Sequence, residues 1–212
     1  MLERLRGVQA IVMRPLARLL LRVGVTPDAV TWFGALSVTV VALVCFPMGW
    51  LWQGAVAIAI LSCSDMIDGH MAREIGPSSR WGSFLDASLD RIADAGVLGA
   101  LAWYLGLHAG PRWAVVAIAA LAAAQMTSYV KARAEAVGCS ADMGIITRAD
   151  RIALALLGAL LAGLGVPLAL EVTMAVLAVG GTVTIIQRIA GVRRQLRSEA
   201  DATTRPTARV RT

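Results

Sequence analysis

Long apolar stretches separated by short turn-forming segments constrain the fold of this chain more than any other feature of its sequence. Each stretch is close to the ~20 residues that an α-helix needs to cross the hydrocarbon core of a membrane. Hydrophobic residues make up 58% of the 212 residues, whereas soluble domains usually contain about 45–50%. We therefore predict an all-α integral membrane protein with six transmembrane helices. These helices are expected at residues 28–46, 50–71, 82–107, 113–134, 149–166 and 168–190.

The first 24 residues predict a helix of another kind. Apolar side chains recur at helical spacing between Leu2 and Val23, while Arg14, Arg18 and Arg22 form a separate row. This pattern indicates an amphipathic juxtamembrane helix whose arginines face the phosphate headgroups of the inner leaflet. Packing of this helix on protein is the alternative. The same arginines interrupt the apolar core that a secretory signal needs.

The distribution of basic residues predicts the orientation of the bundle. The N-terminal helix, the loop at 73–80, the region 131–151 and the tail place their lysines and arginines on one side, whereas Arg112 lies on the other. The positive-inside rule makes the rich side cytoplasmic, so we expect a multi-pass cell-membrane protein. It has one membrane domain, 1–190, and a basic, disordered cytoplasmic tail, 191–212. The net charge of +6 lies beside apolar segments, which argues against a nucleic-acid partner.

Four carboxylates lie where two of the apolar stretches meet their connecting loop. Asp65 and Asp68 are three residues apart near the end of the second span, and Asp86 and Asp90 are four apart near the start of the third. On helices, each pair shares one face. Ionised carboxylates near hydrocarbon are unfavourable unless they are paired or bind metal. Because Mg²⁺ prefers oxygen ligands, we predict a Mg²⁺ site here, on the cytoplasmic side, with Mn²⁺ as a substitute.

The spacing of these residues, D-x2-D-G-x2-A-R-x8-G-x3-D-x3-D, resembles the signature of the CDP-alcohol phosphotransferases. These integral membrane enzymes make phospholipid headgroups from CDP-linked donors. The matching positions are Asp65, Asp68, Gly69, Ala72, Arg73, Gly82, Asp86 and Asp90. The resemblance implies that an alcohol attacks the lipid-side phosphorus of the donor and expels CMP, while bound metal neutralises phosphate charge. It makes Asp65, Asp68 and Asp86 metal ligands, and Asp90 both a ligand and the general base for the acceptor hydroxyl.

The resemblance also implies contacts to the donor, CDP-diacylglycerol. Gly69 lets the nucleotide approach the helix backbone, and Arg73 can bind phosphate with its forked guanidinium. The segment T-P-D-A-V-T resembles a donor-binding element of relatives, although Asp28 replaces an Asn there; a simple helix start capped by Thr26 is the alternative. The full set of donor contacts is Asp28, Ala29, Val30, Thr31, Asp65, Gly69, Arg73 and Ser79.

A group of basic residues at the cytoplasmic ends of the last three spans suits a phosphorylated acceptor. For any one of them, an ordinary positive-inside flank is the alternative. The segments S128-Y-V-K-A-R-A-E135 and T147-R-A-D-R151 further resemble actinobacterial phosphatidylinositol phosphate synthases, and this likeness extends over about residues 5–190. It implies an acceptor-phosphate pocket formed by Lys131, Arg133, Arg151 and Arg188.

The function implied is transfer of the phosphatidyl group of CDP-diacylglycerol to 1D-myo-inositol 3-phosphate, giving phosphatidylinositol phosphate and CMP. We also expect contact with membrane lipids and a homodimer. Glycerol 3-phosphate as acceptor, which gives phosphatidylglycerophosphate, is the main alternative; a divalent-cation transporter and a structural scaffold are the others. Two residues near the motif stay open: His70 either packs or binds a ligand, and Asp94 either pairs with Arg91 or lines the acceptor pocket.

Overall fold

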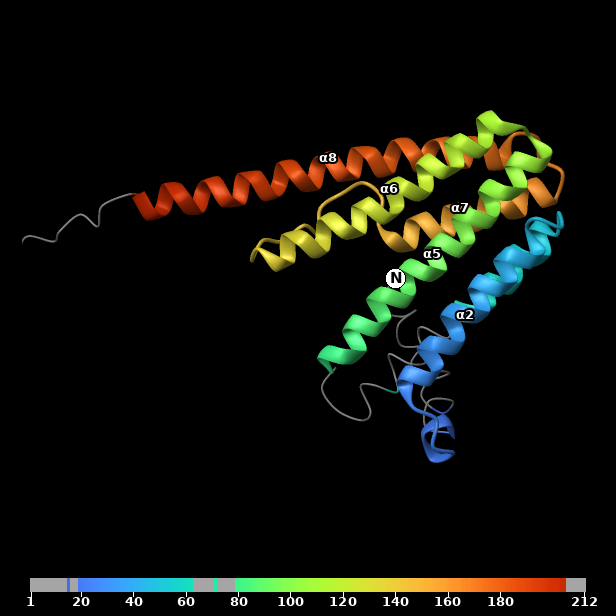
Figure 1. Cartoon of the computed structure of the whole chain (residues 1–212), viewed down its shortest axis with the longest axis horizontal. Helices are drawn as coiled ribbons and strands as arrows, with labels where there is room; N and C mark the ends of the chain where they lie inside the picture. The colour runs from blue at the N-terminus through green and yellow to red at the C-terminus, as the bar shows by residue number, and fades with distance from the viewer. Residues whose placement is uncertain (1–14, 16–18, 63–70, 72–78, 205–212) are drawn as a thin grey trace, which may run out of the picture.

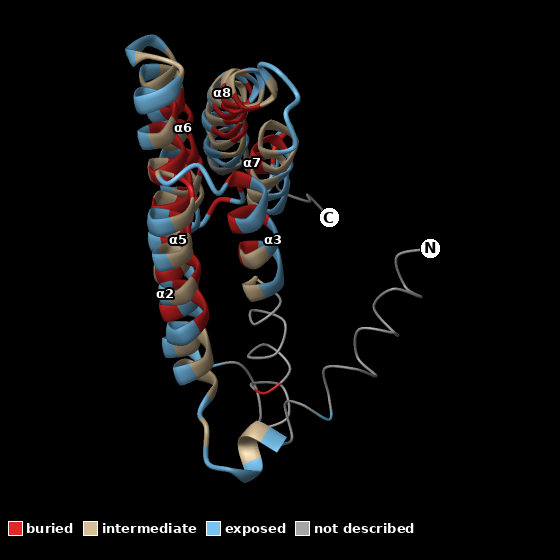
Figure 2. Ribbon diagram, turned by 90° about the vertical axis from the view of Figure 1, so that its right-hand side faces the viewer, coloured by how far each residue is buried: buried red, intermediate tan, exposed pale blue. Residues whose placement is uncertain are grey.

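The structure, a computed structural model, describes residues 15, 19–62, 71 and 79–204, and all regular secondary structure in this part of the chain is helical (Figure 1). The all-α prediction is therefore confirmed for these residues. The helices named in Figure 1 and Figure 2 are α2 (Pro27–Cys45), α3 (Leu51–Leu61), α5 (Arg80–His108), α6 (Pro111–Ala136), α7 (Arg148–Gly163) and α8 (Ala169–Thr204).

Three of the described helices, α2, α6 and α8, are long and apolar enough to cross a membrane. Large apolar side chains also point outward from the bundle, among them Phe33 at 67% exposure and Val179 at 65%. A soluble protein rarely exposes so much contiguous apolar surface, so these faces are suited to lipid. The chain is a membrane protein, and the described part of α3, with 11 residues, is too short by itself to span the hydrocarbon core.

The helix boundaries follow local capping chemistry. Thr26 caps α2, as predicted, because its hydroxyl oxygen accepts a hydrogen bond from the backbone N–H of Ala29 (3.2 Å). Thr147 and Asp150 form a reciprocal capping box at the start of α7. Between α5 and α6, Gly110 adopts a φ of 96°, a conformation that glycine reaches without strain. The observed starts and ends of α2, α5, α6 and α7 therefore lie within a few residues of the predicted spans.

The prediction for the tail is wrong over residues 191–204. We expected disorder from residue 191, but α8 continues as a helix to Thr204. One cause is a tertiary contact: the amide of Gln195 accepts a hydrogen bond from the N–H of Ser140 (3.0 Å) and donates one to its carbonyl (2.7 Å). The side chain of Gln195 thus satisfies both the N–H and the C=O of Ser140. These two hydrogen bonds stabilise the extension of α8 relative to a free tail.

The helices form a closed ring. Each packs mainly against two neighbours in the order α2, α5, α6, α8, α7 and α3, and α3 returns to α2. Figure 2 shows this ring as two stacks, with α2, α5 and α6 on one side and α8, α7 and α3 on the other. Buried residues lie on the faces that meet. The ring therefore brings polar side chains of α5, α6, α7 and α8 close together, although they are far apart in the sequence.

Small residues allow this close packing. A Cβ placed on Gly96 of α5 would lie 2.9 Å from the methyl carbon of Thr39, and one on Gly181 of α8 would lie 2.9 Å from the Cβ of Ala123. Real Cβ atoms do not approach so closely, so these two positions need glycine unless the helices move apart. The contacts fix the separation of α2 from α5 and of α6 from α8, and with it the spacing of the side chains between them.

Candidate active site

The described half of the aspartate motif lies on α5. Asp86, Asp90 and Asp94 recur every four residues and therefore share a face of this helix. Their burial increases along the row: Asp86 is exposed, the Asp90 side chain is 17% exposed, and that of Asp94 is 2% exposed. The motif residues Asp65, Asp68, Gly69, Ala72 and Arg73, together with His70, lie outside the described residues.

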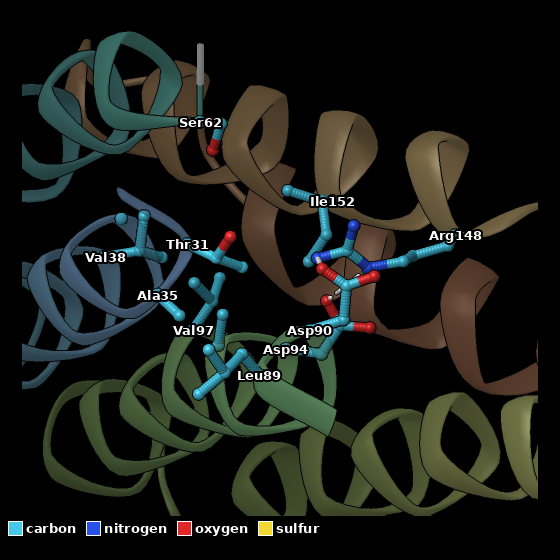
Figure 3. A pocket seen from close by; sticks show the side chains of 12 residues that line it. Thr31, Ala35, Val38, Ser62, Leu89, Asp90, Asp94, Val97, Arg148 and Ile152 are labelled. Carbon is cyan, nitrogen blue, oxygen red and sulfur yellow. Dashed lines mark hydrogen bonds and ion pairs between the residues drawn. The ribbon is translucent and has the colours of Figure 1, made fainter. Parts of the chain in front are cut away.

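A pocket opens beside Asp90, between α2, α5 and α7 (Figure 3). Asp90, Asp94 and Arg148 form its charged wall, while Val38 and Val97 lie on the apolar wall. A pocket with charged groups at one side and aliphatic groups at the other suits a ligand with a phosphate and an apolar portion. The remaining lining residues are Thr31, Gly34, Ala35, Ser62, Leu89, Ala93 and Ile152.

Arg148, from the first turn of α7, joins the last two aspartates of the row. Its Nη2 lies 2.7 Å from Oδ1 of Asp90, and its Nε donates a hydrogen bond to Oδ1 of Asp94 (3.2 Å). Figure 3 shows the guanidinium beside the two carboxylates. Its side chain is 35% exposed and lines the pocket, so it is accessible to a ligand there. The sequence identified Arg148 only as one of several basic residues flanking the spans.

Arg151, one turn further along α7, points to a different set of partners. Its side chain is 4% exposed; Nη2 donates to Oδ2 of Asp94 (3.1 Å), and Nη1 donates to the hydroxyl of Thr127 on α6 (2.6 Å). Arg188 of α8 donates to the carbonyl of the same Thr127 (2.6 Å) and to the carbonyl of Met143 (3.0 Å). Thr127 thus joins two of the four cations predicted to bind the acceptor phosphate.

The other two predicted cations have more open surroundings. Lys131 lies one turn after Thr127 on α6 and pairs with Asp142 of the following loop and with Glu135. Arg133 is exposed and lies two residues further on, so it does not share a helix face with Lys131. The structure therefore brings Arg151 and Arg188 together at Thr127, places Lys131 on the same side of α6, and leaves Arg133 apart.

Asp142 is the anionic neighbour of this group of cations. A hydrogen bond from Lys131, and then one from Ser140, lower the pKa of the Asp142 carboxyl below its ordinary value. Its surroundings favour the charged carboxylate because both partners donate to it. No pattern in the sequence singles out Asp142, since an aspartate in a glycine-containing loop is common.

The predicted donor segment forms the first turn of α2. Asp28 accepts a hydrogen bond from Nε1 of Trp81 on α5 (2.9 Å), and Thr31 lines the pocket. Ala29 and Val30 lie between them on the same turn. Ser79, also predicted to bind the donor, caps α5 by accepting a hydrogen bond from the N–H of Gly82 (2.8 Å). The start of α2 is therefore beside Asp90, whereas Ser79 stands at the tip of α5.

The residues present suit a hard divalent cation. Asp86 and Asp90 offer carboxylate oxygens from successive turns of one helix face, which is the ligand type that Mg²⁺ and Mn²⁺ prefer. Within the described residues, no three His, Cys, Asp or Glu side chains gather into a complete ligand set. The two other predicted ligands, Asp65 and Asp68, belong to the part of the chain that the structure does not describe.

Comparisons with known proteins give a consistent picture. The family model for CDP-alcohol phosphatidyltransferases matches residues 24–191. The phosphatidylinositol phosphate synthase of Cutibacterium acnes is 43% identical over 210 residues, covering 93% of this chain and all of that protein. The enzyme of the same name from Mycolicibacterium smegmatis is 44% identical, covering 85% and 83%.

Solved structures of a relative are also similar. The crystal structure of Mycobacterium tuberculosis phosphatidylinositol phosphate synthase with CDP-DAG bound has a TM-score of 0.84 and 39% identity, covering 96% of this chain and 99% of that one. The structure of the same enzyme in complex with manganese and citrate has a TM-score of 0.82 and 40% identity, covering 94% and 93%. That relative therefore binds manganese.

Proposed function

Because the chain belongs to the CDP-alcohol phosphatidyltransferase family, we propose that it transfers the phosphatidyl group of CDP-diacylglycerol to 1D-myo-inositol 3-phosphate. The products are phosphatidylinositol phosphate and CMP. The observation that carries this proposal is the close similarity, over nearly the whole chain, to phosphatidylinositol phosphate synthases. The arginines beside Asp90 support it, since they suit an acceptor that brings its own phosphate.

The acidic residues have the role of binding metal and activating the acceptor. In this proposal Asp65, Asp68, Asp86 and Asp90 hold Mg²⁺, for which Mn²⁺ substitutes. The bound cation neutralises charge on the donor pyrophosphate. Asp90 accepts the proton of the attacking hydroxyl. The half-buried position of Asp90 on the pocket wall supports this role, because a general base must reach the hydroxyl that it deprotonates.

The donor lies at the start of α2 and along the motif. We assign its contacts to Asp28, Ala29, Val30, Thr31, Asp65, Gly69, Arg73 and Ser79. The position of Thr31 in the pocket, on the wall opposite Arg148 in Figure 3, supports this placement. The hydrogen bond between Trp81 and Asp28 also favours it, because it connects the start of α2 to the helix that carries Asp90. The apolar residues that line the pocket suit the lipid portion of the donor.

The acceptor phosphate is assigned to Lys131, Arg133, Arg151 and Arg188. Support comes from the meeting of Arg151 and Arg188 at Thr127. In addition, three arginines of the described site, Arg91, Arg148 and Arg151, lie beside Asp90 and Asp94. Several guanidinium groups gathered in a partly buried site favour binding of an anion. A free polyol or serine brings no such charge.

The same proposal includes a membrane topology. Residues 1–190 form one domain with a juxtamembrane helix at 1–24 and six transmembrane helices, and the protein is a homodimer. It lies in the cell membrane with its site facing the cytoplasm, where soluble inositol phosphate and Mg²⁺ are available. The three long apolar helices and the basic residues near the site support this orientation.

The proposal is tested by measuring CMP release from CDP-diacylglycerol by the purified protein in lipid nanodiscs. Inositol 3-phosphate, glycerol 3-phosphate, free inositol and serine are compared as acceptors, with Mg²⁺ or with EDTA. We expect release with inositol 3-phosphate and Mg²⁺, and none in EDTA, because the facing carboxylates need a cation. Full activity in EDTA after metal-free purification would contradict the proposed metal site. Release with serine or free inositol alone would remove the phosphorylated acceptor.

A further inference from the structure

Asp94 is a buried carboxylate that the proposed chemistry does not use. Its side chain is 2% exposed, in the core of the helix ring. Placing an ionised carboxylate in such a position is unfavourable unless several donors compensate it. The donors are present, since Arg148, Arg151 and Arg91 lie at 3.2, 3.1 and 3.7 Å from its oxygens. Of the two alternatives for Asp94, the pairing with Arg91 is present but is the longest of the three contacts, and Asp94 also lines the pocket.

The two oxygens of Asp94 hold two arginines that point in different directions. Oδ1 accepts from Nε of Arg148, whose Nη2 continues to Asp90. Oδ2 accepts from Nη2 of Arg151, whose Nη1 continues to Thr127. One carboxylate therefore connects the proposed general base with a proposed acceptor-phosphate cation. Because both oxygens are occupied, neither arginine can rotate without breaking a buried hydrogen bond.

The fixed arrangement has a consequence for binding. A flexible arginine loses side-chain entropy when it orders around a ligand, and an arginine already held in place does not. Arg151 is held at Asp94 and Thr127, and its Nε has no hydrogen-bond partner among the described residues. Arg148 is held at the pocket wall and is partly exposed. Both guanidiniums are therefore oriented before any substrate arrives.

We propose that Asp94 is a positioning residue, which orients Arg148 and Arg151 so that the acceptor phosphate and the hydroxyl next to Asp90 are held in register. Arg148 is a further contact to the phosphorylated acceptor. This inference rests on the proposed function. If Asp94 positions the arginines, its loss weakens use of the acceptor far more than binding of the donor. If its role is purely structural, its loss weakens both alike.

The first test uses two substitutions of different severity. Asp94→Asn keeps the size of the side chain but turns one acceptor oxygen into an N–H₂ group that faces an arginine. Thr127→Val removes the hydroxyl that receives Arg151 and leaves the backbone carbonyl that receives Arg188. Thr127→Ser keeps the hydroxyl and is its matched control. Glu171→Gln, in the first turn of α8 and several turns before Arg188, is an acid-to-amide control outside the site.

The readouts are the KM for inositol 3-phosphate, the KM for CDP-diacylglycerol, and kcat, in nanodiscs with Mg²⁺. We expect Asp94→Asn to raise the acceptor KM about tenfold or more, since 1.4 kcal/mol corresponds to tenfold, while the donor KM changes less than about threefold. Thr127→Val should give a smaller rise in the same direction. Thr127→Ser and Glu171→Gln should stay within about twofold of the wild type.

Substrate-induced shifts in Tm provide a second measurement that does not need turnover, because a ligand that binds only the folded state raises Tm. Asp94→Asn should keep the shift given by CDP-diacylglycerol with Mn²⁺ and lose most of that given by inositol 3-phosphate. Equal loss for both substrates, or no loss in either variant, would overturn the inference. If the wild type itself shows no response to inositol 3-phosphate, the proposed function fails instead. If Asp94→Asn does not fold, the inference is tested by comparing the acceptor KM of Thr127→Val with that of Thr127→Ser.

Discussion

The acidic and basic side chains of the site are held in different ways. Asp86 and Asp90 come from a single helix, and the face that they share becomes more exposed toward the start of α5. Arg151 and Arg188 come from two helices and are buried, with hydrogen bonds to α5, α6 and the loop before α7. One region is open on one side, and the other is enclosed by protein.

This difference in burial indicates whether the side chains of each region can change their binding partners. An exposed or half-buried carboxylate can change partners at little cost, as binding of a cation and release of a proton require. A buried arginine cannot change partners at little cost, because leaving its charge without a partner in the interior is strongly unfavourable. We therefore expect substitutions on the acidic side to affect the rate of reaction, and those on the enclosed basic side to affect acceptor affinity and folding together.

The largest effect is expected at Asp90. Asp90→Asn should lower kcat by about 100-fold or more, because general base catalysis contributes roughly 10²–10⁴-fold. Binding of CDP-diacylglycerol should be largely retained, as measured by the shift in Tm that it produces. Turnover above a few per cent of the wild-type value would show that Asp90 is not the base.

The next largest effect is expected at the buried arginines. Arg151→Ala and Arg188→Ala each remove charge-assisted hydrogen bonds, which contribute about 1.5–3 kcal/mol apiece. Each substitution should lower kcat/KM for inositol 3-phosphate about 10- to 100-fold and also lower Tm. Titration of each substrate at a fixed level of the other separates the two effects. Equal loss for donor and acceptor would mean that these arginines serve the fold or the donor.

Lys131 and Arg133 allow two cations on different faces of α6 to be compared. Lys131 lies on the side of Thr127 and is half-buried, whereas Arg133 is exposed and lies on another face. Lys131→Ala should therefore raise the acceptor KM about three- to tenfold, and Arg133→Ala should change it less than about twofold. Neither variant should lower Tm appreciably, since exposed charges contribute little to stability. A larger effect at Arg133 would show that the bound state rearranges this end of α6.

The smallest effect is expected at Asp142. Hydrogen bonds from Lys131 and Ser140 lower its pKa, so its pairing with Lys131 is present above the ordinary aspartate pKa and is lost as pH falls through the lowered one. At neutral pH the carboxylate competes with a phosphate for Lys131. Asp142→Asn should lower the acceptor KM by about twofold or less at pH 7, and the difference from the wild type should shrink in acid. An increase in KM would mean that Asp142 helps to position Lys131.

Much of the acidic region could be predicted from the sequence, because spacing along one helix determines which carboxylates share a face. The capping preference of threonine likewise indicated Thr26 as a start for α2. The contacts of the basic side chains could not be predicted in this way. Arg148, Arg151 and the other cytoplasmic cations look alike as flanks of apolar spans, and their partners, such as Thr127, lie on other helices. The extension of α8 likewise depends on Gln195 and Ser140, which are far apart in the sequence.

The most direct test of the account is a competition experiment on the purified protein in nanodiscs with CDP-diacylglycerol and Mg²⁺. Inositol 3-phosphate and glycerol 3-phosphate are supplied together at equal concentration, and the lipid products are identified by mass. We predict that phosphatidylinositol phosphate is formed in large excess and in equal amount to the CMP released. Formation of mainly phosphatidylglycerophosphate, or release of CMP without a new phospholipid, would contradict the account.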